Sequence, residues 1–161
     1  MRQLASKLIV RLFEARHAGA ETAVYALLRG AFGLIIVTHG LPKLLGTSHG
    51  SMANPMAGSI NLIENVLYLP GAPVLAMLVA LLEGVGGVML AVGLGTRLVA
   101  ALLALEMIGI CFALGPTWPW IDRGIEYPVL MFFLAVYISS EGAGRFSADR
   151  MIEAGFGPSA A

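Results

Sequence analysis

Charged side chains lie inside long apolar runs of this chain, where they cost free energy unless something neutralises them. Glu83 stands in the run LVALLEGVGGVMLAVGL (residues 78–94), and Glu106 stands in the run that follows. At 1.5 Å per residue, Glu83 lies about 16 Å and Glu106 about 14 Å from one end of its run. A carboxylate at such a depth in a bilayer points by default to a functional site.

Basic residues on the first apolar run are candidate partners for these carboxylates. Arg29, Ile36 and Lys43 recur every seven residues and share a helical face, and His39 lies one turn from Lys43. We expect Glu83 to line the bundle interior, with Arg29, His39 or Lys43 as its partner. The candidate polar network comprises Arg29, His39, Lys43, Glu83, Glu106, Arg123 and Glu126.

These residue types suit the polar end of a ligand pocket between helices. A carboxylate and a histidine can exchange the protons that accompany reduction of a quinone. Structural roles stay open beside this one. The basic side chains can snorkel to the interfaces, the histidine can bond a carbonyl, and each glutamate can form a structural pair or stay protonated. The glycines after Glu83 can serve helix packing alone.

Metal ligands are sparse in the sequence. The chain has one cysteine, Cys111, and three histidines, of which only His39 falls in an apolar run. A bis-histidine haem needs two facing ligands, and zinc needs a larger ligand set. The sequence therefore predicts no metal site and no intrinsic cofactor, with quinone as the expected ligand and a partner protein as the source of electrons.

Composition identifies the class of protein that holds these residues. Of 161 residues, 58% are hydrophobic and 12% are charged, about half the charged fraction of a soluble domain. This predicts an all-α integral membrane protein. The net charge of zero gives no sign of a nucleic-acid partner; the expected partners are the lipid bilayer and other membrane or redox subunits or further copies of the chain.

A spanning helix needs about 20 mostly apolar residues. Four runs meet or approach that length, which predicts a four-helix transmembrane bundle over residues 24–140. The expected spans are about 24–45, 72–94, 97–115 and 122–140, the last of which begins with charged residues. Residues 1–23 predict an amphipathic helix on the cytoplasmic membrane surface, because apolar side chains share one face beside several basic ones. Residues 141–161 predict a cytoplasmic tail with a short helix capped by Ser147.

Lysine and arginine counts set the expected orientation. The N-terminal segment, the turn at Arg97 and the tail carry most of them, whereas the opposite side has Arg123 and Lys43. Basic residues favour the cytoplasmic side. Both termini are therefore expected in the cytoplasm.

Four motifs in order resemble the DoxX family of small four-helix bacterial membrane proteins. They are LLRGAFGLIIVTHGLPKLLG (27–46), ALLEGVGGVMLAVGLGTRLVA (80–100), RGIEYPVLMFFLA (123–135) and GAGRFSAD (142–149). The positions that carry the resemblance are Arg29, Gly33, Gly40, Lys43, Glu83, Gly86, Gly87, Gly93, Thr96, Arg97, Glu126, Pro128, Ser147 and Asp149.

The resemblance implies a multi-pass protein of the bacterial inner (plasma) membrane and a subunit role in a quinone- or thiol-linked redox complex. A structural or assembly subunit without its own activity, and a small transporter of protons or solutes, are the alternatives. Whether such a subunit is itself catalytic stays open, because one fold serves several activities.

Overall fold

The computed structural model describes the backbone of residues 2–156 and the side chains of residues 19–119 and 121–155. Across residues 2–156 the chain is helical and contains no β-strand, so the predicted all-α class is confirmed. The elements are α1 (Arg2–Leu45), α2 (Pro55–Asn61), the π-helical η1 (Leu62–Val66), α3 (Ala72–Leu81), the π-helical η2 (Leu82–Gly86), α4 (Gly87–Val92), α5 (Thr96–Leu114), the 3-10 turn η3 (Trp120–Asp122), α6 (Glu126–Glu141) and α7 (Ala148–Phe156).

Three helical stretches are long and apolar enough to cross a membrane. They are Gly19–Leu45 within α1, Ala72–Val92 across α3, η2 and α4, and Thr96–Leu114, which is α5. Helix α6 has 16 residues and is about 24 Å long, short of the roughly 20 residues that a span needs. The predicted fourth span at 122–140 therefore stays a prediction.

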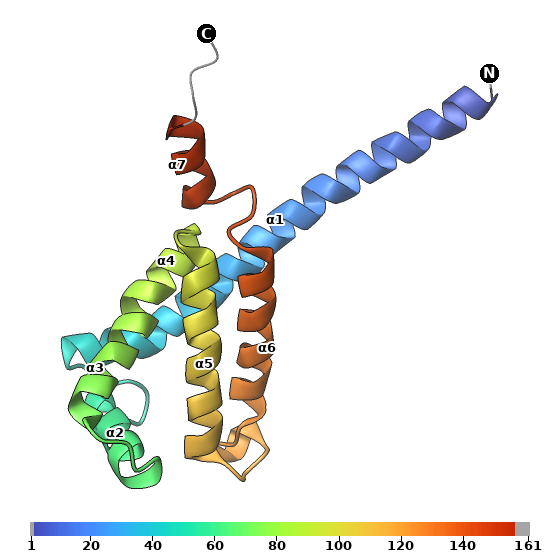
Figure 1. The fold of residues 1–161 in the computed structure, drawn as a ribbon. Coiled ribbons are helices and arrows are strands. Elements are labelled where there is room, and N and C mark those ends of the chain that lie inside the picture. The colour runs from blue at the N-terminus through green and yellow to red at the C-terminus, as the bar shows by residue number, and fades with distance from the viewer. Residues whose placement is uncertain (1, 157–161) are drawn as a thin grey trace.

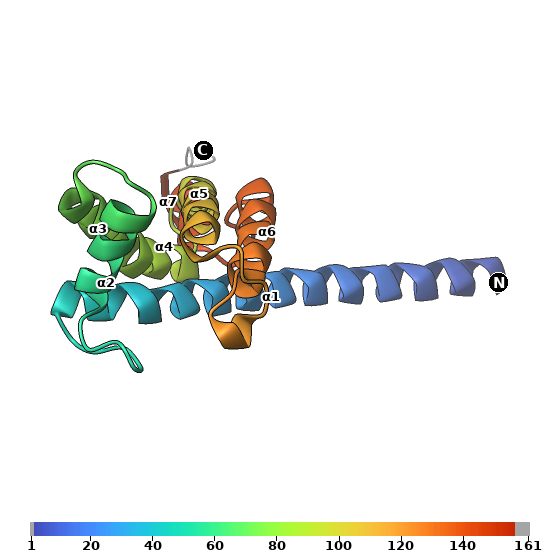
Figure 2. The same cartoon turned by 90° about the horizontal axis from the view of Figure 1, so that it is seen from below.

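The helices form a row that rests on one long rod. Figure 2 shows α1 running straight along one side of the row made by α3–α4, α5 and α6. Helix α1 extends far beyond that row toward the N-terminus, and α7 lies at the same end of the bundle as the turn between α4 and α5 (Figure 1). We call this the tail end, and the opposite end, with the loops 46–71 and 115–125, the loop end.

Residues 2–23 are helical and form the first part of α1, which continues without a break from Arg2 to Leu45. The side chains of residues 2–18 lie outside the described ones, and so does the tail beyond Phe156. The amphipathic face and its placement on the membrane surface stay predictions.

Close contact between α1 and the second span depends on two glycines of α1. A Cβ atom at Gly33 would lie 2.6 Å from the backbone nitrogen of Ala91, and one at Gly40 would lie 2.6 Å from Cβ of Glu83. Both separations are far below van der Waals contact, so no side chain fits at either position. Small residues of this kind let the backbones of membrane helices touch.

The bundle buries its apolar side chains in one main cluster and exposes many more. Phe32, Leu90, Leu103 and Ile138, from four different helices, are buried together at this cluster. The outer surface carries large apolar side chains, among them Leu27, Leu34, Leu98, Leu105, Phe112, Leu130 and Phe133. An apolar surface of this extent matches hydrocarbon, so the protein's environment is a lipid bilayer.

The tail holds the tail end of the bundle together. The Arg29 guanidinium, 2% exposed, donates from Nη2 to the carbonyl of Phe146 at 2.8 Å and from Nη1 to the carbonyl of Ala143. Asp149 accepts a hydrogen bond from the backbone N–H of Gly95 at 2.9 Å, at the start of α5. We call these contacts the tail clasp.

Candidate functional site

A buried ion pair joins the first span to the second. Lys43 Nζ donates to Glu83 Oε2 at 2.6 Å, and their side chains are 12% and 5% exposed. Removing one member of a buried pair leaves the other charge without compensation, which is strongly destabilising. Of the three partners considered for Glu83, the structure selects Lys43.

A π-helical turn positions Glu83. In η2, at the end of the turn, the backbone N–H of Gly87 reaches the carbonyl of Leu82, five residues back, as well as that of Glu83, four residues back. Such a turn inserts one residue into a helix and is frequent at functional sites. Gly40 packs against the backbone of this turn, so that α1 brings Lys43 within reach of the carboxylate.

Glu106 on α5 is the second carboxylate of the site. It lies within electrostatic reach of Glu83 and Lys43. Both of its carboxylate oxygens are buried, and neither makes a hydrogen bond of ordinary geometry within the described part of the chain. Two carboxylates and one ammonium therefore share a small volume between α1, η2 and α5. We call Lys43, Glu83 and Glu106 the charge triad.

Two histidines pack together beside the charge triad. The rings of His39 on α1 and His49 in the following loop have centroids 5.0 Å apart and are tilted by 60°. A pair of backbone hydrogen bonds between His49 and Met52 closes the turn that returns the loop to α1. His39 is the histidine of the apolar run, and the loop folds His49 back onto it.

An apolar cavity of about 810 Å³ adjoins these polar residues. Its walls come from the end of α1, the 46–71 loop, α3, η2, α5 and the start of α6, and its polar members include His39, Lys43, Glu83 and Glu106. The volume lies within the range typical of small-molecule sites, about 300–1,000 Å³. A mostly apolar pocket with a few charged groups at one place is the usual form of such a site.

The cavity reaches the lipid-facing surface between α3 and α5. Leu78 on α3 and Leu102 and Leu105 on α5 line it while being 57%, 43% and 65% exposed. Figure 1 shows α3 diverging from α5 toward the loop end, whereas α4 and α5 meet at the tail end. A molecule dissolved in the bilayer can therefore approach from the side.

The remaining candidate residues lie elsewhere or at the rim. Arg29 shares a face with Lys43 in the sequence pattern, but its guanidinium turns toward the tail carbonyls and belongs to the tail clasp. Arg123 lines the cavity at the loop end, with an exposed side chain and a left-handed backbone (φ 60°). Glu126 begins α6, is exposed, and does not line the cavity.

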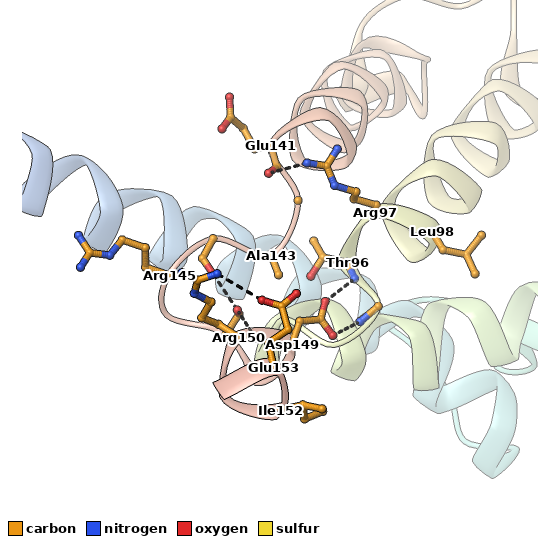
Figure 3. Close-up of a pocket in the computed structure, with 14 residues that line it drawn as sticks. Thr96, Arg97, Leu98, Glu141, Ala143, Arg145, Asp149, Arg150, Ile152 and Glu153 are labelled. Atoms are coloured by element: carbon orange, nitrogen blue, oxygen red, sulfur yellow. Dashed lines mark hydrogen bonds and ion pairs between the residues drawn. The ribbon is translucent and has the colours of Figure 1, made fainter. Parts of the chain in front are cut away.

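A second cavity, of about 840 Å³, lies at the tail end (Figure 3), but its polar groups bind one another. Asp149 caps the start of α5, and Arg97 Nη1 donates to the carbonyl of Ser140 at 2.9 Å. Arg150 pairs with Glu153 at 3.3 Å, and its backbone N–H donates to Oγ of Ser147, the residue predicted as the N-cap of α7. The arrangement is that of a structural clasp.

Comparison with known proteins identifies the family of the chain. The DoxX family model matches residues 24–116, more than half of the chain. This chain belongs to the DoxX family. It is also 28% identical over 127 residues to the Bacillus subtilis (strain 168) protein "Putative oxidoreductase CatD", an alignment that covers 78% of this chain and 84% of that protein. No solved structure matches it significantly.

Several of the positions that carry the resemblance to the DoxX family lie in one of two places in the structure. Gly40, Lys43 and Glu83 build the intramembrane pair and the close helix contact beside it. Arg29 and Asp149 build the tail clasp. The motifs that resemble the DoxX family therefore include residues of the charge triad and residues of the tail clasp at the opposite end of the bundle.

Several features of this DoxX site lie beyond sequence reasoning. Hydropathy does not predict the π-helical turn at η2, because one additional residue hardly changes the hydropathy of the apolar run that contains it. The approach of His49 and Met52 depends on the path of a loop. The side opening depends on the angle between α3 and α5, which no local pattern encodes.

Proposed function

We propose that this DoxX protein is a multi-pass subunit of a quinone- or thiol-linked redox complex of the inner membrane, and that it binds a quinone-like apolar ligand in the cavity between α3 and α5. The observation that carries the proposal is the apolar cavity, open toward lipid, with the charge triad at its wall. The family and a relative named as an oxidoreductase support a redox role.

The chemistry of the cavity suits a neutral, ring-shaped ligand with carbonyl groups. Its leucines and isoleucines provide an apolar surface, and the Lys43 ammonium is a hydrogen-bond donor for a carbonyl oxygen. His39 and Glu83 are side chains of the types that serve as general acids and bases, so they could exchange the protons that accompany reduction of such a ligand. Electrons come from a partner protein in this proposal, which makes the chain a ligand-binding subunit.

A titration of the purified protein with a short-chain quinone tests the proposal. We expect saturable binding, weakened at least tenfold by Glu83→Gln, because an amide cannot hold the Lys43 ammonium in place. Glu153→Gln, at an exposed position far from the cavity, is the control. Unchanged affinity in both Glu83→Gln and Glu106→Gln would refute quinone binding at the triad.

The side opening has its own matched pair of variants on α5. Leu105→Trp narrows the opening, whereas Leu98→Trp adds the same bulk at an equally exposed position outside this cavity (65% and 68% exposed). We expect slower quinone association with Leu105→Trp and a wild-type rate with Leu98→Trp. Equal rates in the two variants would contradict entry from the bilayer.

The buried ion pair also favours a second candidate, an assembly subunit whose polar network only stabilises the bundle. In that case Glu83→Gln lowers thermal stability and no quinone binds.

Co-purification in mild detergent tests the subunit role. A redox partner that co-purifies supports the redox complex, whereas an oligomer of this chain alone, with proton flux in proteoliposomes, supports transport instead.

A further inference from the structure

The charge triad contains one more negative group than it has cations. Lys43 pairs with Glu83 at 2.6 Å, and the two buried oxygens of Glu106 accept no hydrogen bond from a cationic or N–H donor among the residues that the structure describes. The side chain within hydrogen-bonding reach of Glu106 is the Glu83 carboxylate. A buried, unpaired carboxylate is costly in a medium of low dielectric constant, and such a group takes up a proton instead. Neighbouring Glu83 adds repulsion to that cost.

Other groups around the cavity do not supply the missing positive charge. His39 packs ring against ring with His49, and its burial, the His49 ring and Lys43 all disfavour a cation there, against the attraction of Glu83. Arg123 is at the exposed rim. Tyr127, from α6, completes the titratable lining, and a phenol group cannot become a cation.

We propose that Glu106 holds a proton in the resting protein, so that Lys43, Glu83 and Glu106 form a neutral unit with one exchangeable proton. The proton can pass from the Glu106 carboxyl to the Glu83 carboxylate while the Lys43 ammonium changes its ion-pair partner from Glu83 to Glu106. One O–H bond breaks and one forms, and the total charge of the unit stays at zero. The proton can therefore move between the two carboxyl groups without changing the net charge of the cavity wall, and giving it up to a reduced ligand would leave the unit with one net negative charge.

This inference deepens the proposed function, because a neutral wall suits an uncharged quinone and the stored proton is available when the ligand is reduced. Glu106 has this role without touching a ligand, since both of its oxygens are shielded in the structure. It is a positioning and proton-storing residue, and its protonation can be measured with no ligand present.

Infrared spectroscopy of the purified full-length protein, exchanged between H₂O and D₂O, tests the protonation directly. We expect an isotope-sensitive carbonyl band of a protonated carboxyl group in the wild type at neutral pH, absent from Glu106→Gln and retained in the control Glu153→Gln. Lys43→Met should increase the band about twofold, because Glu83 loses its cation and takes up a proton as well. A missing wild-type band, or a band that persists in Glu106→Gln, would overturn the proposal.

Two further variants keep the test interpretable. Glu106→Asp retains a carboxyl group if Glu106→Gln fails to fold, and a shifted band in place of a lost one is then the expected result. His39→Gln tests whether a protonated histidine balances Glu106; appearance of the acid band only in that variant would contradict the proposal. If the wild-type protein bound no quinone but showed the expected infrared bands, the quinone proposal would be refuted and the protonation of Glu106 would still be supported.

Discussion

Lys43 determines the electrostatics of the site because a single ammonium faces two buried carboxylates. Replacing Lys43 by Met leaves Glu83 without its cation, and we expect the free energy of unfolding to fall by about 3–5 kcal/mol, the usual cost of breaking a buried pair from one side. Thermal unfolding in detergent, followed by tryptophan fluorescence, measures the change.

The double variant Lys43→Met with Glu83→Gln is the matched control for this prediction. It removes both charges, so a large part of the loss should be recovered. A double variant as unstable as the sum of the two single ones would mean that the ion pair contributes nothing as a pair.

Arg29 is the buried cation of the tail end, and backbone carbonyl groups compensate its charge in place of a carboxylate. Its two terminal nitrogens reach two carbonyls, which a lysine ammonium on a single point cannot do in the same geometry. Arg29→Lys should lower the free energy of unfolding by about 1.5–3 kcal/mol, the range for one hydrogen bond to a charged group. Thermal unfolding in detergent measures this loss. An unfolding midpoint equal to that of the wild type would show that one hydrogen bond to a tail carbonyl is enough for stability.

Contact between α1 and η2 sets whether the site forms at all. Gly40→Ala places a methyl group 2.6 Å from Cβ of Glu83, so the helices must separate, and overpacking of this kind costs about 1–3 kcal/mol. Gly30→Ala, on the same helix, meets its nearest atom, the carbonyl oxygen of Ala91, at an ordinary 3.9 Å. We expect a lowered unfolding midpoint and weakened quinone binding for Gly40→Ala only; equal effects would contradict close packing at the site.

The elements divide into those that sequence predicts and those that it does not. Apolar length predicts the stretches near 24–45, 72–94 and 97–115, because burying the backbone in lipid requires continuous helices. The seven-residue spacing of Arg29 and Lys43 predicts a shared face but not a shared site, since long basic side chains reach along the helix in opposite directions. The sequence predicts Arg29, His39 or Lys43 as the partner of Glu83. Which of the three pairs with it depends on how α1 packs on η2.

The whole molecule is closed at one end and splayed at the other. The tail clasp fixes α1, α5 and α7 together, while α3 and α5 diverge around the cavity. Asp149→Ala removes the carboxylate that caps α5, and we expect a loss of about 0.5–2 kcal/mol, as for other helix caps. Limited proteolysis should then cut the tail near Arg145 and Arg150 faster than in the wild type.

Glu153→Ala is the control for the clasp, because its pair with Arg150 has side chains that are both 68% exposed and such pairs contribute little. We expect wild-type proteolysis for this variant. Equal cleavage of the two variants would show that the tail is held by something other than Asp149.

The π-helical turn makes the second span sensitive to deletion. One residue corresponds to about 100° of rotation around a helix axis. Deleting a single residue within 82–86 would restore a regular helix and rotate α3 by that angle relative to α4. Leu75, Leu78 and Val79 would leave the cavity wall, although hydropathy and length would hardly change. The number of residues between 72 and 92 therefore matters as much as their hydropathy, because it sets the rotation of α3 about its axis and with it the side chains that line the cavity.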